Sequence, residues 1–100
     1  MRYCLNIGCG RDIKKSTKDE KWINVDKAKI KGVDAVHDLD KTPWPFKDNY
    51  FDEIYARDSI EHVKDLVKVM KEIHRVSKNN GKVRLIVPYW HSSCAFYPNH

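Results

Sequence analysis

Short apolar runs alternate with polar segments along the chain, and most of these runs end in a glycine, a proline or an acidic residue. Apolar runs of this length that stop at turn signals are typical of β-strands. We therefore expect strands at residues 3–7, 22–26, 33–36, 51–56 and 82–87.

One segment follows a longer period. From Ser59 to Val76 the apolar residues recur at spacings of three and four, which puts them on one face of a helix. They are Ile60, Val63, Leu66, Val67, Met70, Ile73 and Val76. The sequence Asn79-Asn80-Gly81 is typical of a C-terminal cap, so we expect it to end this helix.

The remaining segments predict irregular structure. Residues 11–21 are polar and rich in lysine, without helical periodicity, and favour a loop or a single helical turn. Residues 41–49 contain two prolines and favour an extended loop that closes in a turn. The tail, residues 89–100, is aromatic and irregular, and we expect no further element there.

Strands separated by crossovers, one of them helical, predict an α/β fold with a mostly parallel sheet. Nothing divides the chain, so residues 1–100 are interpreted as a single domain. In open parallel sheets, ligands bind beyond the carboxyl ends of the strands. The residues at or just past these ends are Gly8, Asp26, Asp38, Arg57 and Tyr89.

Composition narrows the class of protein. At 100 residues, 41% hydrophobic and 33% charged, the chain can form one small core and is not a disordered polyelectrolyte. Its apolar runs are far shorter than the roughly 18 residues of a membrane span. Three cysteines cannot all pair within one chain, which favours reduced thiols and a soluble, cytoplasmic protein.

The first strand is followed by Gly8-Cys9-Gly10, a turn that lets a ligand approach main-chain N–H groups closely. Ile13 stands where the dinucleotide-binding fingerprint requires its third glycine, and no phosphate-loop ending is present. A plain tight turn is the alternative interpretation.

Two acidic residues end the second and third strands. Asp26 could accept hydrogen bonds from both hydroxyls of a ribose, or it could simply pair with a nearby lysine. Asp38 could accept a bond from an adenine amino group while the N–H of Leu39 meets a ring nitrogen, or it could be a turn-forming aspartate. One nucleoside ligand would explain all three strand ends together.

Six segments, in this order, resemble the motifs of class I S-adenosylmethionine-dependent methyltransferases. They are residues 5–10 (LNIGCG), 22–26 (WINVD), 37–40 (HDLD), 45–52 (PFKDNYFD), 59–63 (SIEHV) and 76–83 (VSKNNGKV). The resemblance implies a Rossmann-like sheet with strand order 3-2-1-4-5 and S-adenosylmethionine as cofactor. It also implies that the chain is truncated, because the family usually builds seven strands.

The resemblance also implies roles for individual residues. Asn6, Gly8 and Gly10 belong to the motif that holds the amino-acid part of the cofactor. Asp26 corresponds to the ribose ligand, and Asp38 with Leu39 to the adenine contacts. Arg57 and Asp58 would lie beside the sulfonium, and His62 near the mouth of the site.

Methyl transfer of this kind is a direct in-line displacement, so positioning supplies most of the catalysis. If a general base is required, His62 is the best candidate, with Asp58 or His91 as lesser ones. An exposed histidine at a helix end is the alternative for His62. The acceptor is not indicated by any motif.

A chain that stops after five strands would leave an open sheet edge, and such an edge predicts self-association or a partner chain. The chain is therefore interpreted as a cofactor-binding half that is either truncated or completed by a partner. A non-catalytic module that binds the cofactor or its demethylated product is the leading alternative to an enzyme.

A metal site and a nucleic-acid surface have weaker support. His91, Cys94 and His100, with Cys9 and His62, could supply metal ligands, but their spacing matches no compact zinc motif, and we expect no metal. The net charge of +5 and the lysines between residues 14 and 31 could bind nucleic acid. Interrupted charge runs of this kind are usually solvated faces.

Overall fold

The computed structural model describes residues 1–57, 59–86 and 94–96. In chain order the elements are β1 (Arg2–Ile7), β2 (Glu20–Asp26), β3 (Ala35–Val36), β4 (Phe51–Arg57), the 3-10 turn η1 (Ile60–His62), α1 (Leu66–Val76), β5 (Ser77–Ile86) and β6 (Cys94–Phe96). The five predicted strands are all present. Residues 11–19 form no helix, as expected for the first crossover.

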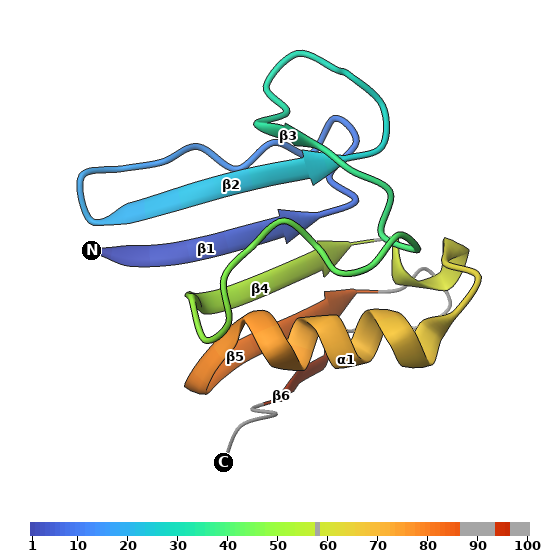
Figure 1. Cartoon of the computed structure of the whole chain (residues 1–100). Coiled ribbons are helices and arrows are strands. Elements are labelled where there is room, and N and C mark those ends of the chain that lie inside the picture. The colour runs from blue at the N-terminus through green and yellow to red at the C-terminus, as the bar shows by residue number, and fades with distance from the viewer. Residues whose placement is uncertain (58, 87–93, 97–100) are drawn as a thin grey trace.

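All six strands form one sheet, in the order β3-β2-β1-β4-β5-β6 (Figure 1). The first five strands are parallel, which confirms the predicted order 3-2-1-4-5. β6 pairs antiparallel with β5, Val83 lying opposite Phe96. The expectation of no further element in the tail was therefore wrong, because a three-residue strand is too short to show a period and forms by pairing with an existing edge.

The apolar face of the sheet carries the core. Leu5 in β1, Ile54 in β4 and Val83 in β5 are fully buried and lie side by side in register. Helix α1 lies across this face (Figure 1) and contributes buried Val69 and Ile73 to the same cluster. Each fully buried aliphatic side chain contributes about 1.5–3 kcal/mol, so this layer fixes the sheet against α1.

The opposite face of the sheet is polar and aromatic. Arg2 forms ion pairs with Glu20 and Glu53, at 2.7 and 3.2 Å. The rings of Tyr55 and Trp22 pack in a T-shaped arrangement, and the ammonium of Lys14 lies 4.3 Å from the centroid of the Tyr55 ring. Parallel sheets usually carry helices on both faces. In the described part of this chain, the first-crossover loop covers that face and no helix does.

Helix α1 is shorter than the helix that the apolar spacing predicted. Residues 60–62 form only a 3-10 turn, and α1 begins at Leu66, where the Asp65 side chain accepts a hydrogen bond from the Lys68 N–H. α1 ends at Val76, so Asn79-Asn80-Gly81 does not cap it as predicted. Asn80 instead adopts a positive φ of 63° inside β5, where the pairing with β4 shifts register.

The later start also changes which face of the helix is buried. Leu66 and Val67 are 51% and 64% exposed, whereas Val69 and Glu72 are buried. The irregular residues between η1 and α1 break the helical phase, so a single stripe running from Ile60 to Val76 does not form. The prediction of that continuous stripe was wrong for Leu66 and Val67.

One side chain joins α1 to the proline-containing loop. The Arg75 guanidinium donates to the carbonyl oxygens of Trp44 and Phe46 at 3.0 and 2.9 Å. It also pairs with Asp48 at 2.6 Å and with both carboxylate oxygens of Glu72 at 2.8 and 2.9 Å. These bonds satisfy loop carbonyls that have no strand or helix partner, and they hold the loop against the helix.

Candidate active site

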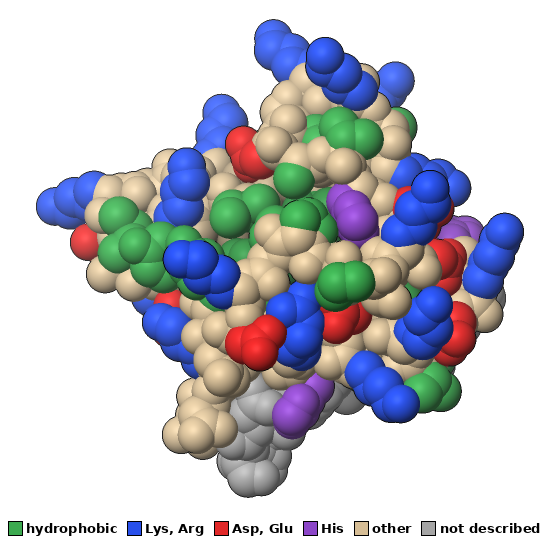
Figure 2. All heavy atoms as spheres, in the orientation of Figure 1, with side chains coloured by type: hydrophobic (Ala, Val, Ile, Leu, Met, Phe, Trp, Pro, Cys, Tyr) green, Lys and Arg blue, Asp and Glu red, His purple; other side chains and the backbone are tan. Residues whose placement is uncertain are grey.

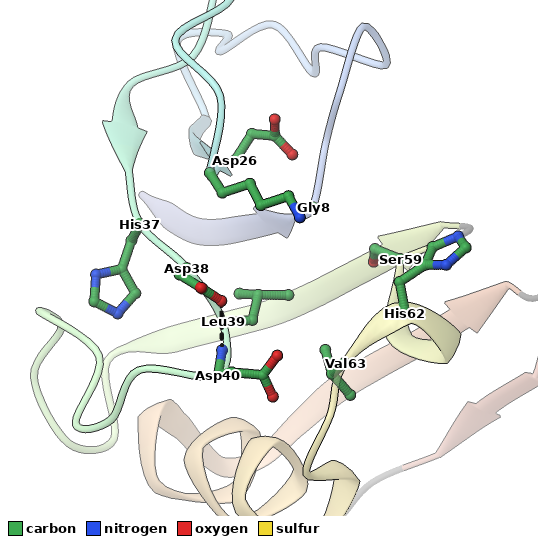
Figure 3. A pocket seen from close by; sticks show the side chains of 10 residues that line it. Gly8, Asp26, His37, Asp38, Leu39, Asp40, Ser59, His62 and Val63 are labelled. Carbon is green, nitrogen blue, oxygen red and sulfur yellow. Dashed lines mark hydrogen bonds between the residues drawn. The ribbon is translucent and has the colours of Figure 1, made fainter.

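The carboxyl ends of the parallel strands meet at one edge of the sheet, and a pocket of about 230 Å³ opens there (Figure 3). It is lined by Gly8, Asp26, Lys27, His37, Asp38, Leu39, Asp40, Ser59, His62 and Val63. These residues come from the segments that follow β1, β2, β3 and β4. The pocket is slightly smaller than those that enclose drug-sized ligands, about 300 Å³ and upward, so it suits part of such a ligand, for example a nucleoside.

The turn after β1 requires glycine at its first position. Gly8 has a φ of 62°, which side chains disfavour. A Cβ atom there would overlap the Cβ of Ser59, whose hydroxyl donates to the Ile7 carbonyl oxygen at 3.1 Å. Gly10 also has a positive φ of 52°, but a Cβ there would meet no atom within 4 Å, and Gly10 does not line the pocket.

Asp26 ends β2, Asp38 lies two residues after the end of β3, and both side chains close local turns. Asp26 accepts a hydrogen bond from the Ala28 N–H at 3.1 Å, and Asp38 accepts one from the Asp40 N–H at 3.0 Å (Figure 3). Each bond uses one carboxylate oxygen, and none of the described residues bonds the other oxygen. A ligand in the pocket can therefore be recognised by both side chains.

Asp40 ties the pocket to the start of α1. Its carboxylate accepts hydrogen bonds from the N–H groups of Lys64 and Asp65, at 2.9 and 3.1 Å. These bonds stabilise the charged form and hold the pKa of Asp40 below its usual range. The two segments are far apart in sequence, so no local pattern could have revealed this contact.

Of the residues predicted from sequence, Gly8, Asp26, Asp38, Leu39 and His62 line the pocket. Figure 3 shows Ser59 and His62, from the segment after β4, across from His37 and Asp38. Five more residues line the pocket, and the sequence predicted no cofactor-binding or catalytic role for any of them. They are Lys27, His37, Asp40, Ser59 and Val63.

Two further predicted residues, Asn6 and Arg57, are described by the structure and do not line the pocket. Asn6 is buried and donates to the Asp12 carbonyl and to Asn24, at 2.7 and 2.9 Å. Arg57 ends β4 with its guanidinium 4.0 Å from the carboxylate of Asp12. Asp58 lies outside the described residues, as do Tyr89, His91 and His100.

The metal hypothesis gains no support from the part of the chain that the structure describes. Within residues 1–57, 59–86 and 94–96 no group of three or more His, Cys, Asp or Glu side chains is placed to hold a metal ion.

The thiols of Cys4 and Cys9 are protonated at neutral pH. Cys4 and Cys9 are buried and unpaired, and burial raises the pKa of each thiol to about 11. A buried thiol with this pKa is a poor nucleophile, so neither cysteine is a catalytic candidate.

These thiols predict a loss of stability at alkaline pH. Because the folded pKa lies above the unfolded value of 9.0, their contribution is complete below pH 9 and is lost as the pH rises toward 11. We expect a loss on the order of 2 kcal/mol per thiol, measured by urea unfolding across this range. A double Cys4→Ala, Cys9→Ala variant should lose much less stability between pH 9 and 11. An equal loss in both proteins would contradict this assignment.

Comparison with known proteins agrees with this geometry. Residues 8–85 match the family described as a methyltransferase domain. Sterol 4-C-methyltransferase strm-1 of Caenorhabditis elegans is 34% identical in an alignment that is 103 positions long. The alignment covers 80% of this chain and 29% of the nematode protein.

Two solved structures share the fold. A SAM-dependent methyltransferase from Aquifex aeolicus superposes with a TM-score of 0.68 at 18% identity, over 84% of this chain and 55% of that one. A structure of the Trm112 methyltransferase activator of Haloferax volcanii in complex with a methyltransferase gives a TM-score of 0.66 at 20% identity, over 86% and 45% of the two chains.

The fold is therefore that of the Rossmann-like S-adenosylmethionine-dependent methyltransferases. Since the family match covers more than half of its length, this chain belongs to the methyltransferase-domain family. It spans 29% of the sterol methyltransferase and about half of the two structures. No helix among the described residues has the length and apolar character needed to cross a membrane.

Proposed function

We propose that the chain binds S-adenosylmethionine in the strand-end pocket and forms the cofactor-binding part of a methyltransferase. One observation carries this proposal: the Gly8 turn, the Asp26 carboxylate and the Asp38–Leu39 segment line a single pocket. This donor set fits the cofactor, because a carboxylate suits ribose hydroxyls and the missing Cβ atom at Gly8 lets a ligand approach the main chain.

The proposed contacts follow the order of the strands. Gly8 and Gly10 face the amino-acid part, with Asn6 beneath the turn. Asp26 accepts bonds from the ribose hydroxyls, and Asp38 with the Leu39 N–H recognises adenine. Arg57, the last residue of β4, and Asp58, the next in sequence, are the residues that we propose for the sulfonium end.

When bound, the cofactor supplies a methyl group on a sulfonium, which is a good leaving group for in-line displacement. The chain's own contribution is then mainly orientation of the two reactants. His62 lies on the pocket wall contributed by η1, and we propose that it takes a proton from the methyl acceptor where a general base is needed. The apolar side chains of Leu39 and Val63 help to exclude water from the same wall.

Calorimetric titration of the full chain with S-adenosylmethionine tests the proposal. Asp26→Ala should weaken binding at least about tenfold, because the ribose hydroxyls lose their acceptor. Asp19→Ala is the matched control, since it removes the same charge from an exposed loop. His62→Ala should retain binding and lower only methyl transfer, once an acceptor is in hand. Equal affinity in the Asp26 and Asp19 variants would contradict the proposed contacts.

A second candidate is a cofactor-binding module whose acceptor pocket is supplied by a partner or a second copy. The chain alone would then bind the cofactor without catalysis. The Haloferax methyltransferase, which is bound to an activator, is a precedent for a partner of this fold. A sterol, the substrate named for the nematode relative, is a first acceptor to assay.

The nucleic-acid hypothesis lacks such an observation. Figure 2 shows lysine and arginine side chains scattered over the visible face and its rim, with acidic and apolar side chains between them, rather than gathered in one patch. Interspersed charges of this kind do not form the continuous basic stripe of a nucleic-acid surface.

The buried, reduced thiols of Cys4 and Cys9 support a cytoplasmic location.

A further inference from the structure

Asn24, in β2, has a complete set of hydrogen bonds although it lies outside the pocket. It is 3% exposed, and its side-chain oxygen accepts bonds from Asn6 Nδ2 and from the Lys14 N–H, both at 2.9 Å. Its side-chain nitrogen donates to the Lys14 carbonyl at 3.0 Å and to Asp34 Oδ2 at 3.1 Å. Both lone pairs and both N–H groups of the amide are thus used.

The loop between β1 and β2 has its backbone groups bonded by these side chains instead of by a neighbouring strand or a helix. Asn24 bonds both the N–H and the carbonyl of Lys14, as a peptide group of a neighbouring strand would. Asn6 adds a bond to the carbonyl oxygen of Asp12 at 2.7 Å. In most folds of this kind the N-terminus of a helix fixes the ligand-binding turn after the first strand. Here two buried asparagines fix the loop that follows the turn.

The fixed loop is continuous with the glycine turn. The Asp12 N–H donates to the Cys9 carbonyl at 2.8 Å, and the Cys9 N–H donates to the Val25 carbonyl at 3.0 Å. Val25 lies between Asn24 and Asp26 in β2. The backbone of β2 therefore holds the turn at Cys9, and the Asn24 amide holds the loop that follows the turn at Lys14.

We propose that Asn24 is a positioning residue for cofactor binding, which holds the Gly8–Gly10 turn and the Asp26 carboxylate in their relative places. This inference rests on the proposed binding of S-adenosylmethionine. Preorganisation of this kind raises affinity because the loop is already ordered before the ligand arrives.

Asn24→Leu tests the role, since leucine has nearly the shape of asparagine and none of its hydrogen bonds. We expect binding of S-adenosylmethionine to weaken at least about tenfold. Hydrogen exchange of the Lys14 amide in the ligand-free chain should accelerate by at least about tenfold. Ser16→Ala is the matched control: the Ser16 hydroxyl accepts a bond from the Trp22 N–H at 2.9 Å and joins the far end of the same loop to β2. Its affinity should stay within about twofold of the natural chain.

A double variant separates positioning from stability. Asn24→Asp with Asp34→Asn restores the bond between the two side chains but leaves the Lys14 carbonyl facing an oxygen. It also removes the acceptor of the residue 24 backbone N–H, which bonds Asp34 Oδ2 at 2.8 Å in the natural chain. The melting temperature should recover in part relative to Asn24→Leu while the affinity stays low, and this variant decides the matter if Asn24→Leu does not fold. Wild-type affinity in folded Asn24→Leu, or recovery of affinity together with stability in the double variant, would overturn the proposal.

Cofactor binding by the chain and the positioning role of Asn24 can be contradicted by different results. A natural chain that binds no S-adenosylmethionine would overturn the proposed function and, with it, the role of Asn24 in binding. Hydrogen exchange still reports on the loop in that case, and an unchanged rate at Lys14 in Asn24→Leu would show that Asn24 does not hold it.

Discussion

Gly8→Ala is expected to abolish cofactor binding and to lower the free energy of unfolding by about 2–4 kcal/mol, the sum of a left-handed backbone and an overfilled contact. The added methyl group would overlap the Ser59 side chain. Ser59 cannot retreat freely, because its hydroxyl is bonded to the Ile7 carbonyl oxygen. Urea unfolding and calorimetric titration of the same preparation measure both effects.

Gly10→Ala and a double variant are the controls for this prediction. Gly10 has a similar positive φ but open space around it, so its substitution should cost only about 1 kcal/mol of backbone strain. Gly8→Ala combined with Ser59→Gly should recover part of the lost stability, since it removes the overlapping Cβ. If the two glycine variants were equally stable, the close approach of Ser59 would not be the cause.

Arg75→Met is expected to lower the free energy of unfolding by about 3 kcal/mol, in the range seen when one partner of a buried pair is removed. The substitution retains an unbranched apolar stem but leaves Glu72, which is 8% exposed, without its cationic partner. It also leaves the carbonyls of Trp44 and Phe46 without the donors described above. Arg2→Met is the control, because Arg2 is half exposed and its pairs should contribute under about 1 kcal/mol.

The pH dependence of this variant supplies a second readout. The hydrogen bonds from Arg75, opposed in part by burial and supported by the Trp44 N–H, hold the pKa of Glu72 below its ordinary value. Stability from this group is present above the unfolded pKa and is lost as the pH falls through the folded pKa. In Arg75→Met, the free energy of unfolding should therefore fall less as the pH is lowered through the acid range. An acid transition identical to that of the natural chain would contradict this role for Arg75.

Much of the fold was predictable because the determinants are local. The strands were found from short apolar runs, and their carboxyl ends led to Gly8, Asp26, Asp38 and Leu39, all of which line the pocket. Parallel strands point the same way, so the residues that follow them meet at one edge without further information.

The parts that sequence missed depend on contacts between distant segments. Ser59 matters because it packs against Gly8, and Asp40 because its carboxylate meets the start of α1. Arg75 reaches a loop about 30 residues away along the chain, which periodicity cannot indicate. The start of α1 was misplaced for a related reason: η1 and the residues after it interrupt the helical phase although their apolar spacing continues.

Titration of the full chain with S-adenosylmethionine tests the central claim most directly, with folding verified in the same sample by circular dichroism. The account predicts saturable binding at one site, competition by S-adenosylhomocysteine, and loss of both in Asp26→Ala but not in Asp19→Ala. A folded chain that shows no binding of either compound up to about 1 mM, the weak end of specific affinities, would contradict it.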